Sequence, residues 1–190
     1  EAALEAVQTL DAFRSDFGEK TEDFVQEANR RICKKTEENG GVRIGTTFAA
    51  LYINEKTAYG SNIGDSRIYH LRDQKLRQLS IDHTQAQRLV NQGILSREEM
   101  RTHPGKHRLT QHLGIFPEEM IVQAYHAEPI ALKKDDRFLL CSDGLTDMLD
   151  DVQIEKVLCE AKAPTEAAEN LTQLALQAGG RDNITVVVLF

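Results

Sequence analysis

The chain has 190 residues and a formal net charge of −7, with 41% hydrophobic and 28% charged residues. This composition is typical of one globular domain over residues 1–190 and excludes an intrinsically disordered chain. The acidic balance argues against non-specific nucleic-acid binding, which depends on basic side chains that neutralise phosphates. No apolar stretch has the length that a membrane span needs. The three cysteines lack C-x-x-C spacing, which argues against a disulfide framework and a zinc site and favours a reducing, cytoplasmic compartment.

Helical spacing of apolar residues at the start of the chain gives way to alternation. The spacing predicts helices over 2–17 and 20–38, the second with Thr21 as its N-cap and Gly40-Gly41 at its end. From Gly45 onward, alternation predicts an antiparallel meander of strands at 46–53, 57–63, 67–71 and 75–79. We therefore expect an antiparallel helix pair that packs on an apolar surface, followed by a sheet.

Residues 82–118 have a different character from the strands before them. Asp82 or Thr84 can cap one short helix, and Ser96 with Glu99 forms a capping box for another. A polar loop rich in glycine, proline and basic residues follows at 102–108. Such a segment is either a flap that contacts substrate or an ordinary surface insertion, and these residues alone do not decide between the two.

The last third of the chain returns to strands and helices. The pattern predicts strands at 119–127 and 136–141 with a turn at 133–136 between them. It also predicts a helix to Leu158 that is capped by Asp150 or Asp151, a helix at 164–178 and a strand at 184–190. The last strand is almost entirely apolar and β-branched, so we expect it to be central with both faces buried. Helix-rich and strand-rich blocks are segregated, which predicts an α+β fold of antiparallel sheets covered by helices.

Three aspartates lie beside the ends of apolar strands: Asp65, Asp143 and Asp182. Carboxylates gathered at one rim repel one another and need a cation or basic partners. Oxygen ligands without clustered cysteines suit Mg²⁺, Mn²⁺ or Ca²⁺ rather than Zn²⁺. Each residue also has a plainer explanation, because Asp143 can cap a helix, Asp65 can belong to a turn and Asp182 to a polar loop. The occurrence of all three beside strands favours a metal site.

Four ordered motifs resemble the signatures of a known family. They are 45–47 (GTT), 62–67 (NIGDSR), 142–147 (SDGLTD) and 180–188 (GRDNITVVV). They are similar to those of the metal-dependent Ser/Thr protein phosphatases, the type 2C-like or PPM family, and most similar to its bacterial branch. Residues 82–84 (DHT) and 98–104 resemble the flap of that family. The resemblance covers essentially the whole chain and identifies 82–118 as a flap-like insertion.

The resemblance implies a fold, a reaction and a set of ligands. The fold would be an α-β-β-α sandwich of two antiparallel sheets flanked by helices. The reaction would be hydrolysis of phosphoserine and phosphothreonine by a metal-activated water, on phosphorylated proteins of a signalling system that includes a Ser/Thr kinase. Asp143 and Asp182 would ligate one ion of a Mn²⁺ or Mg²⁺ pair, and Asp65 with Asp143 would hold a third, weaker ion.

Basic side chains crowd the flap-like insertion. His103, His107 and Arg108 are weak candidates for contact with a substrate phosphate, and a histidine there can also donate a proton to the leaving group. The alternative is that all of them are ordinary solvent-exposed loop residues.

Two motifs of the family are absent from the sequence. Family members carry an upstream strand with an Arg and a Glu-Asp pair, and another with Asp-Gly-x-Gly-Gly, so the catalytic Asp and Arg cannot be assigned. One explanation is an N-terminally truncated phosphatase whose first strands are missing and whose open sheet edges promote self-association. Another is a catalytically inactive phosphatase-like module that binds a partner. The residues by themselves also allow a cytosolic Mg²⁺- or Ca²⁺-binding α+β domain.

Overall fold

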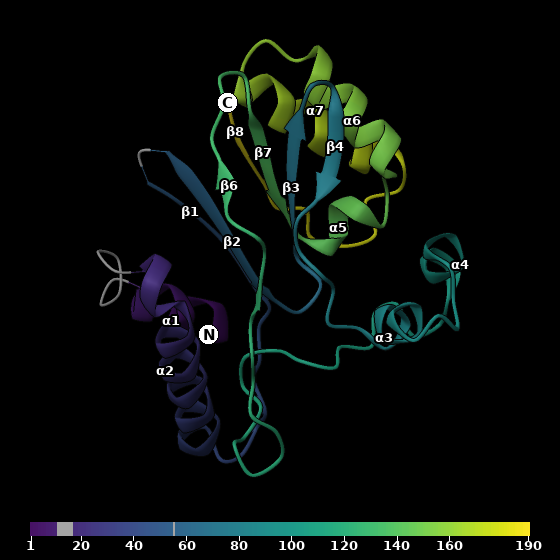
Figure 1. Cartoon of the computed structure of the whole chain (residues 1–190). Helices are drawn as coiled ribbons and strands as arrows, with labels where there is room; N and C mark the ends of the chain where they lie inside the picture. The colour runs from purple at the N-terminus through teal and green to yellow at the C-terminus, as the bar shows by residue number, and fades with distance from the viewer. Residues whose placement is uncertain (11–16, 55) are drawn as a thin grey trace. The chain divides into compact units, whose positions relative to one another are not determined.

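Antiparallel strands and flanking helices make up the structure, a computed structural model that describes residues 1–10, 17–54 and 56–190 (Figure 1). The strands are β1 (Phe48–Ile53), β2 (Thr57–Ile63), β3 (Arg67–Arg72), β4 (Lys75–Gln78), β5 (Tyr125–His126), β6 (Ile130–Ala131), β7 (Arg137–Cys141) and β8 (Val186–Leu189). One sheet has the order β1-β2-β5, with β6 also paired to β2, and the other has the order β4-β3-β7-β8. The expected α+β architecture of two antiparallel sheets with helices is confirmed.

Local capping sets one end of four helices in the described part of the chain. The helices are α1 (Ala2–Leu10), α2 (Phe17–Glu38), α3 (Gln85–Asn91), α4 (Arg97–Thr102), α5 (Asp143–Thr146), α6 (Asp151–Glu160) and α7 (Pro164–Gln177). The side chains of Thr84, Ser96 and Asp150 accept hydrogen bonds from backbone amides in the first turns of α3, α4 and α6. These are the N-caps that the sequence predicts. After α2, the amide of Gly41 donates to the carbonyl of Thr36 at 2.9 Å, which closes that helix at the expected glycine pair.

The N-terminal helices differ from the prediction in their bounds. Residues 11–16 of the predicted helix over 2–17 lie outside the described residues. The second helix begins at Phe17 rather than after Thr21, and it is kinked at Lys20, whose φ of −115° and ψ of 24° are not helical. The kink immediately precedes Thr21, so the expected start of the second helix coincides with a break inside a longer one.

The expected four-strand meander is wrong, because the chain changes sheets between β2 and β3. β2 pairs with β5 and β6, whereas β3 pairs with β4 and β7. The crossover falls at Gly64-Asp65-Ser66. The predicted hairpin of 119–127 with 136–141 is wrong for the same reason, since β5 and β6 pair with β2 but β7 pairs with β3. Asp65 therefore lies where the chain leaves one sheet and enters the other.

The first of two compact units comprises Glu1–Phe48, Ser61–Asp65 and Asp82–His126. In it α1 packs against α2, which buries an apolar stripe. Gln26 on α2 donates to the carbonyl of Val122 at 2.7 Å, and the amide of Gln123 donates to the Gln111 side chain at 2.8 Å. Because side chains take these backbone groups, the predicted strand at 119–127 is reduced to β5.

The second unit comprises Ala49–Gly60, Ser66–Ile81 and Ala127–Phe190 and has apolar clusters on both faces of the β4-β3-β7-β8 sheet. On one face, Tyr69 and Leu139 pack with Leu145, Ile154 and Leu171 of α5, α6 and α7. On the other face, side chains of β3 and β7 pack against residues of β1, β2 and β6. Side chains of β3 and β7 thus point alternately into two apolar clusters, one on each face of the sheet. This packing holds in place the strand that follows Asp65 and the strand that precedes Asp143.

β8 is an edge strand, which contradicts the expectation of a central strand buried on both faces. Among the described strands it pairs with β7 alone, with Leu189 opposite Phe138 at one end and Val186 opposite Cys141 at the other. In the part of the chain that the structure describes, no strand pairs with its other edge, and Val187 is 51% exposed. An apolar strand without charged side chains therefore presents an open edge.

The remaining expectations concern thiols and membranes. Cys33, Cys141 and Cys159 are all free, and Cys141 is buried in β7 as a small apolar residue. Among the described helices, none combines the length and apolar character required to cross a membrane.

Candidate metal centre

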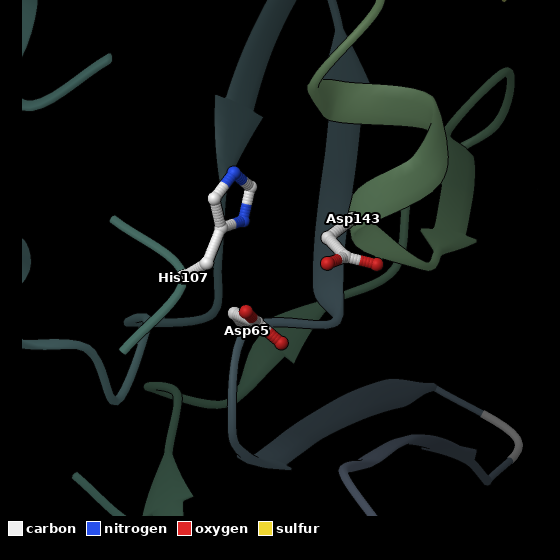
Figure 2. Close-up of side chains that lie close together, drawn as sticks. All are labelled: Asp65, His107 and Asp143. Atoms are coloured by element: carbon white, nitrogen blue, oxygen red, sulfur yellow. The ribbon is translucent and has the colours of Figure 1, made fainter. Parts of the chain in front are cut away.

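Asp143 follows β7 and is the first residue of the short helix α5 (Figure 2). The N-cap position belongs to Ser142, whose side chain makes no capping hydrogen bond to the helix. Ser142 Oγ instead donates to the carbonyl of Asn183 at 3.1 Å and accepts from the amide of Thr185 at 3.0 Å. The alternative in which Asp143 caps a helix is therefore wrong, because Asp143 lies inside the first turn.

Asp182 lies in the loop that leads into β8. The antiparallel pairing of Cys141 with Val186 places this loop beside the end of β7 from which Asp143 projects. The amide of Ser142 also donates to the carbonyl of Thr185 at 3.1 Å. Asp182 itself is exposed, and its Oδ1 accepts from the amide of Asn183 at 2.7 Å. The loops that carry these two carboxylates are thus joined by hydrogen bonds that the amide and the side chain of Ser142 make.

Asp65 belongs to the first unit, in the turn that follows β2. Within the same unit, His107 and Asp65 each offer a possible ligand atom, and these two atoms lie within 4.8 Å of each other (Figure 2). Asp65 is partly buried and His107 is exposed. A carboxylate oxygen and an imidazole nitrogen at this separation suit either a shared cation or a common polar ligand.

The other two flap-like candidates lie in different surroundings. His103 is the C-cap residue of α4, and its Nδ1 accepts from the amide of Gly105 at 3.0 Å. Arg108 is exposed, and its carbonyl accepts from the amide of Gln85 at 2.9 Å. Of the three substrate-contact candidates, His103, His107 and Arg108, it is His107 that lies beside the candidate metal ligand Asp65.

Sequence reasoning missed the part that His83 plays at this site. Its Nδ1 accepts from the amide of Gly64 at 3.1 Å, directly beside Asp65. Burial lowers the pKa of His83, against a smaller opposing effect of the Asp82 charge. In the sequence, His83 is one of several histidines in the insertion, and no local pattern links it to Gly64, which lies 19 residues earlier.

Comparison with known proteins identifies the family. The sequence profile of the family described as Stage II sporulation protein E (SpoIIE) matches residues 1–189. The chain belongs to this family. The SpoIIE match and the phosphatases below confirm the relationship to PPM-type Ser/Thr phosphatases that the four motifs indicated.

Relatives and solved structures agree on this relationship. The serine/threonine phosphatase stp of Listeria monocytogenes is 33% identical over 166 residues, which are 87% of this chain and 64% of that protein. The serine/threonine phosphatase PstP/Ppp of Mycobacterium tuberculosis has a fold with a TM-score of 0.85 at 32% identity, covering 98% of this chain and 80% of that one. A PstP catalytic domain in complex with two manganese ions has a TM-score of 0.84 at 31% identity, covering 98% and 79%. The chain therefore spans somewhat less than two thirds of the Listeria relative.

Proposed function

We propose that this chain belongs to the catalytic domain of a metal-dependent phosphatase that hydrolyses phosphoserine and phosphothreonine in proteins. The observation that carries the proposal is the pair of loops that present Asp143 and Asp182 and are joined through Ser142. Hydrogen bonds of Ser142 hold the segments that carry these two carboxylates side by side before any ion binds, and such preorganisation lowers the cost of assembling a metal site. The Ser/Thr phosphatase relatives support the same reading.

The donor atoms of these loops fit Mn²⁺ or Mg²⁺. Both side chains are carboxylates, and hard divalent cations prefer oxygen ligands. We assign Asp143 and Asp182 to one ion of a catalytic pair, and Asp65 with Asp143 to a third, weaker ion. We include Asp65 because only Ser66 separates it from β3. Arg67, the first residue of β3, pairs with Cys141, the last residue of β7, and Asp143 follows two residues after Cys141. The two-manganese PstP structure supports the choice of metal.

The chain's own residues have distinct parts in the proposed reaction. When bound, the ions would lower the pKa of water enough to supply a nucleophile for phosphorus near neutral pH. Asp65, Asp143 and Asp182 hold the site in place, and His107 contacts the substrate phosphate or gives a proton to the leaving group. Arg108 is exposed and attracts the phosphate electrostatically, while His103 has a weaker claim because its ring bonds within its own turn.

The proposed partners follow from the proposed substrate. They are phosphorylated proteins, and a Ser/Thr kinase system must supply them because the substrate bond is made by phosphoryl transfer to serine or threonine. Free thiols support a cytoplasmic location. The open edge of β8 supports self-association of the chain, with no part for nucleic acid.

The test is Mn²⁺-dependent hydrolysis of an aryl phosphate and a phosphothreonine peptide by the full-length protein. Asp143→Asn and Asp182→Asn are each expected to remove metal-dependent turnover and weaken Mn²⁺ binding, with little loss of folding. Asp73→Asn is the matched control, because Asp73 lies in the β3–β4 turn with a φ of 52° that asparagine also tolerates. Unchanged Mn²⁺ binding in Asp143→Asn would contradict the assigned site.

The same assay separates the alternative function, an inactive phosphatase-like binding module. That alternative predicts no turnover with Mn²⁺ or Mg²⁺ even where Mn²⁺ binds. Metal-dependent turnover that disappears in both aspartate variants rejects the module and supports the enzyme.

A further inference from the structure

Three side chains of the first unit, those of Thr47, Asn62 and His83, lie against the turn that carries Asp65. Gly64 has a φ of +95°, and a Cβ at that position would lie 2.4 Å from Cγ2 of Thr47. The Asn62 side chain donates to the carbonyl of Gly64 at 3.3 Å. The third side chain is that of His83. Because Asp65 follows Gly64 directly, whatever fixes Gly64 also orients the Asp65 carboxylate.

His83 bonds to both polar backbone groups of Gly64. Its Nδ1 accepts from the Gly64 amide at 3.1 Å, and its own amide donates to the Gly64 carbonyl at 2.8 Å. A backbone amide can only donate, so Nδ1 carries no proton and the ring is the neutral Nε2–H tautomer. The lowered pKa of His83, which burial causes, agrees with this neutral form. Nδ1 is thus engaged by the turn rather than available to an ion.

The same residue, near the start of the flap-like insertion, ties the turn to a later part of that insertion. The carbonyl of His83 accepts from the amide of Thr110 at 2.8 Å, and Thr84 forms a bridge with Leu109. The segment that is bonded to His83 in this way carries His107 a few residues earlier. His83 therefore lies between two segments, one bearing Asp65 and the other bearing His107, whose candidate ligand atoms are within 4.8 Å.

We propose that His83 is a positioning residue that orients Asp65 for metal binding and holds the flap-like segment in register with it. The inference rests on the proposed function, in which Asp65 is a ligand of the weaker ion. It adds that the affinity for this ion depends on a hydrogen-bond acceptor at the Nδ1 position of residue 83. Groups that orient metal ligands from outside the coordination shell typically change metal affinity about 10- to 100-fold when removed.

The experiment measures binding of Mn²⁺ alone to the full-length protein by electron paramagnetic resonance, which detects the free aqueous ion and requires no turnover. The variants are Asp65→Asn, His83→Ala, His83→Asn and His83→Gln. Asparagine can place Oδ1 near the position of Nδ1, whereas alanine has no acceptor and glutamine places its oxygen farther along the side chain. Circular dichroism and thermal unfolding of each variant report whether it is folded.

His83→Ala is expected to weaken Mn²⁺ binding at the weaker site by about 10- to 100-fold, and His83→Asn is expected to restore most of it. Binding at the tighter site stays unchanged in both. The inference is overturned if His83→Ala binds Mn²⁺ like the wild type. It is also overturned if folded His83→Asn is as weak as His83→Ala.

Two further outcomes are decisive. If His83→Ala does not fold, the comparison of His83→Asn with His83→Gln takes its place, and equal affinities overturn the inference. If Asp65→Asn leaves Mn²⁺ binding unchanged, Asp65 is not a ligand, and both this inference and the assignment of the weaker ion fail. That result is distinguishable from a failure that is confined to the His83 variants.

Discussion

Gly144 lies so close to the loop before β8 that a Cβ on it would come within 2.2 Å of the carbonyl oxygen of Asn183. Real side-chain carbons do not approach backbone oxygens this closely, so only glycine fits. Gly144 follows Asp143, and Asn183 follows Asp182. The contact between the two neighbours therefore sets how near the two proposed ligands lie.

Gly144→Ala is expected to push the Asp182 loop away from Asp143. Mn²⁺ affinity and metal-dependent turnover should both fall, and the free energy of unfolding should fall by about 1–3 kcal/mol because of overpacking. Calorimetric Mn²⁺ titration and urea unfolding measure the two effects. Gly60→Ala is the control, since its new Cβ would meet Ile68 and Ala127 at ordinary distances of 3.5 Å and 3.6 Å. Wild-type Mn²⁺ affinity in Gly144→Ala would show that this contact does not position the site.

Asp136 links the start of β7 to β3 through a two-point ion pair. Arg72 Nε donates to Oδ1 at 2.7 Å and Nη2 donates to Oδ2 at 2.6 Å. The amide of Lys133 donates to the same carboxylate at 2.8 Å, and His70 Nε2 lies 3.1 Å from it. Burial alone would raise the pKa of Asp136, but Arg72, the Lys133 amide and His70 together hold it below its usual range.

Asp136→Asn should lower the free energy of unfolding at neutral pH by about 1–3 kcal/mol, because charge-assisted hydrogen bonds are lost. Since the folded-state pKa is depressed, the stabilisation is fully present above the unfolded-state pKa of about 4 and is lost progressively as the pH falls from there through the lower folded-state pKa. Urea unfolding from neutral pH to about pH 3 should therefore show a difference between wild type and variant that is constant at neutral pH and begins to shrink in acid. Asp135→Asn, at a residue with a φ of 67°, is the control. A constant difference at all pH values would show that the ion pair is not its source.

Val187→Lys should reduce self-association of the chain. Val187 is 51% exposed on the open edge strand β8, and a lysine on a strand edge opposes pairing with another strand. Sedimentation velocity over a range of concentrations measures the change. Val152→Lys on α6 is the control, because Val152 is 74% exposed but lies away from the sheet edge. If the wild type stays monomeric at high concentration, the open edge does not cause association.

His107→Ala should lower kcat/KM for a phosphothreonine peptide by about 10- to 100-fold, the loss that corresponds to one hydrogen bond with a charged group. His103→Ala should have a smaller effect, because the ring of His103 bonds to Gly105 within its own turn. Steady-state kinetics at saturating Mn²⁺ separate the two variants. If kcat/KM falls equally in both variants, His107 has no larger part in the reaction than His103, and its position beside Asp65 has no catalytic meaning.

Much of the local structure follows from the sequence alone. Capping at Thr84, Ser96 and Asp150, the end of α2 at Gly40-Gly41, and strand β2 all depend on chemistry within a few residues. The motifs around Asp65, Asp143 and Asp182 identify the family in the same way, because each is a short run of residues. The apolar runs beside these carboxylates are enough to place them next to strand ends.

Tertiary structure decided which segments meet. The crossover at Asp65, the edge position of β8 and the loss of most of the predicted strand at 119–127 all concern hydrogen-bond partners that are distant in the sequence. So do the bonds from His83 to Gly64 and from Ser142 to Asn183 and Thr185. Backbone amides and carbonyls are alike in every residue, and a strand can satisfy them with any suitably placed partner. Periodicity therefore predicts that a segment is extended, whereas the packing of the whole chain selects its partner.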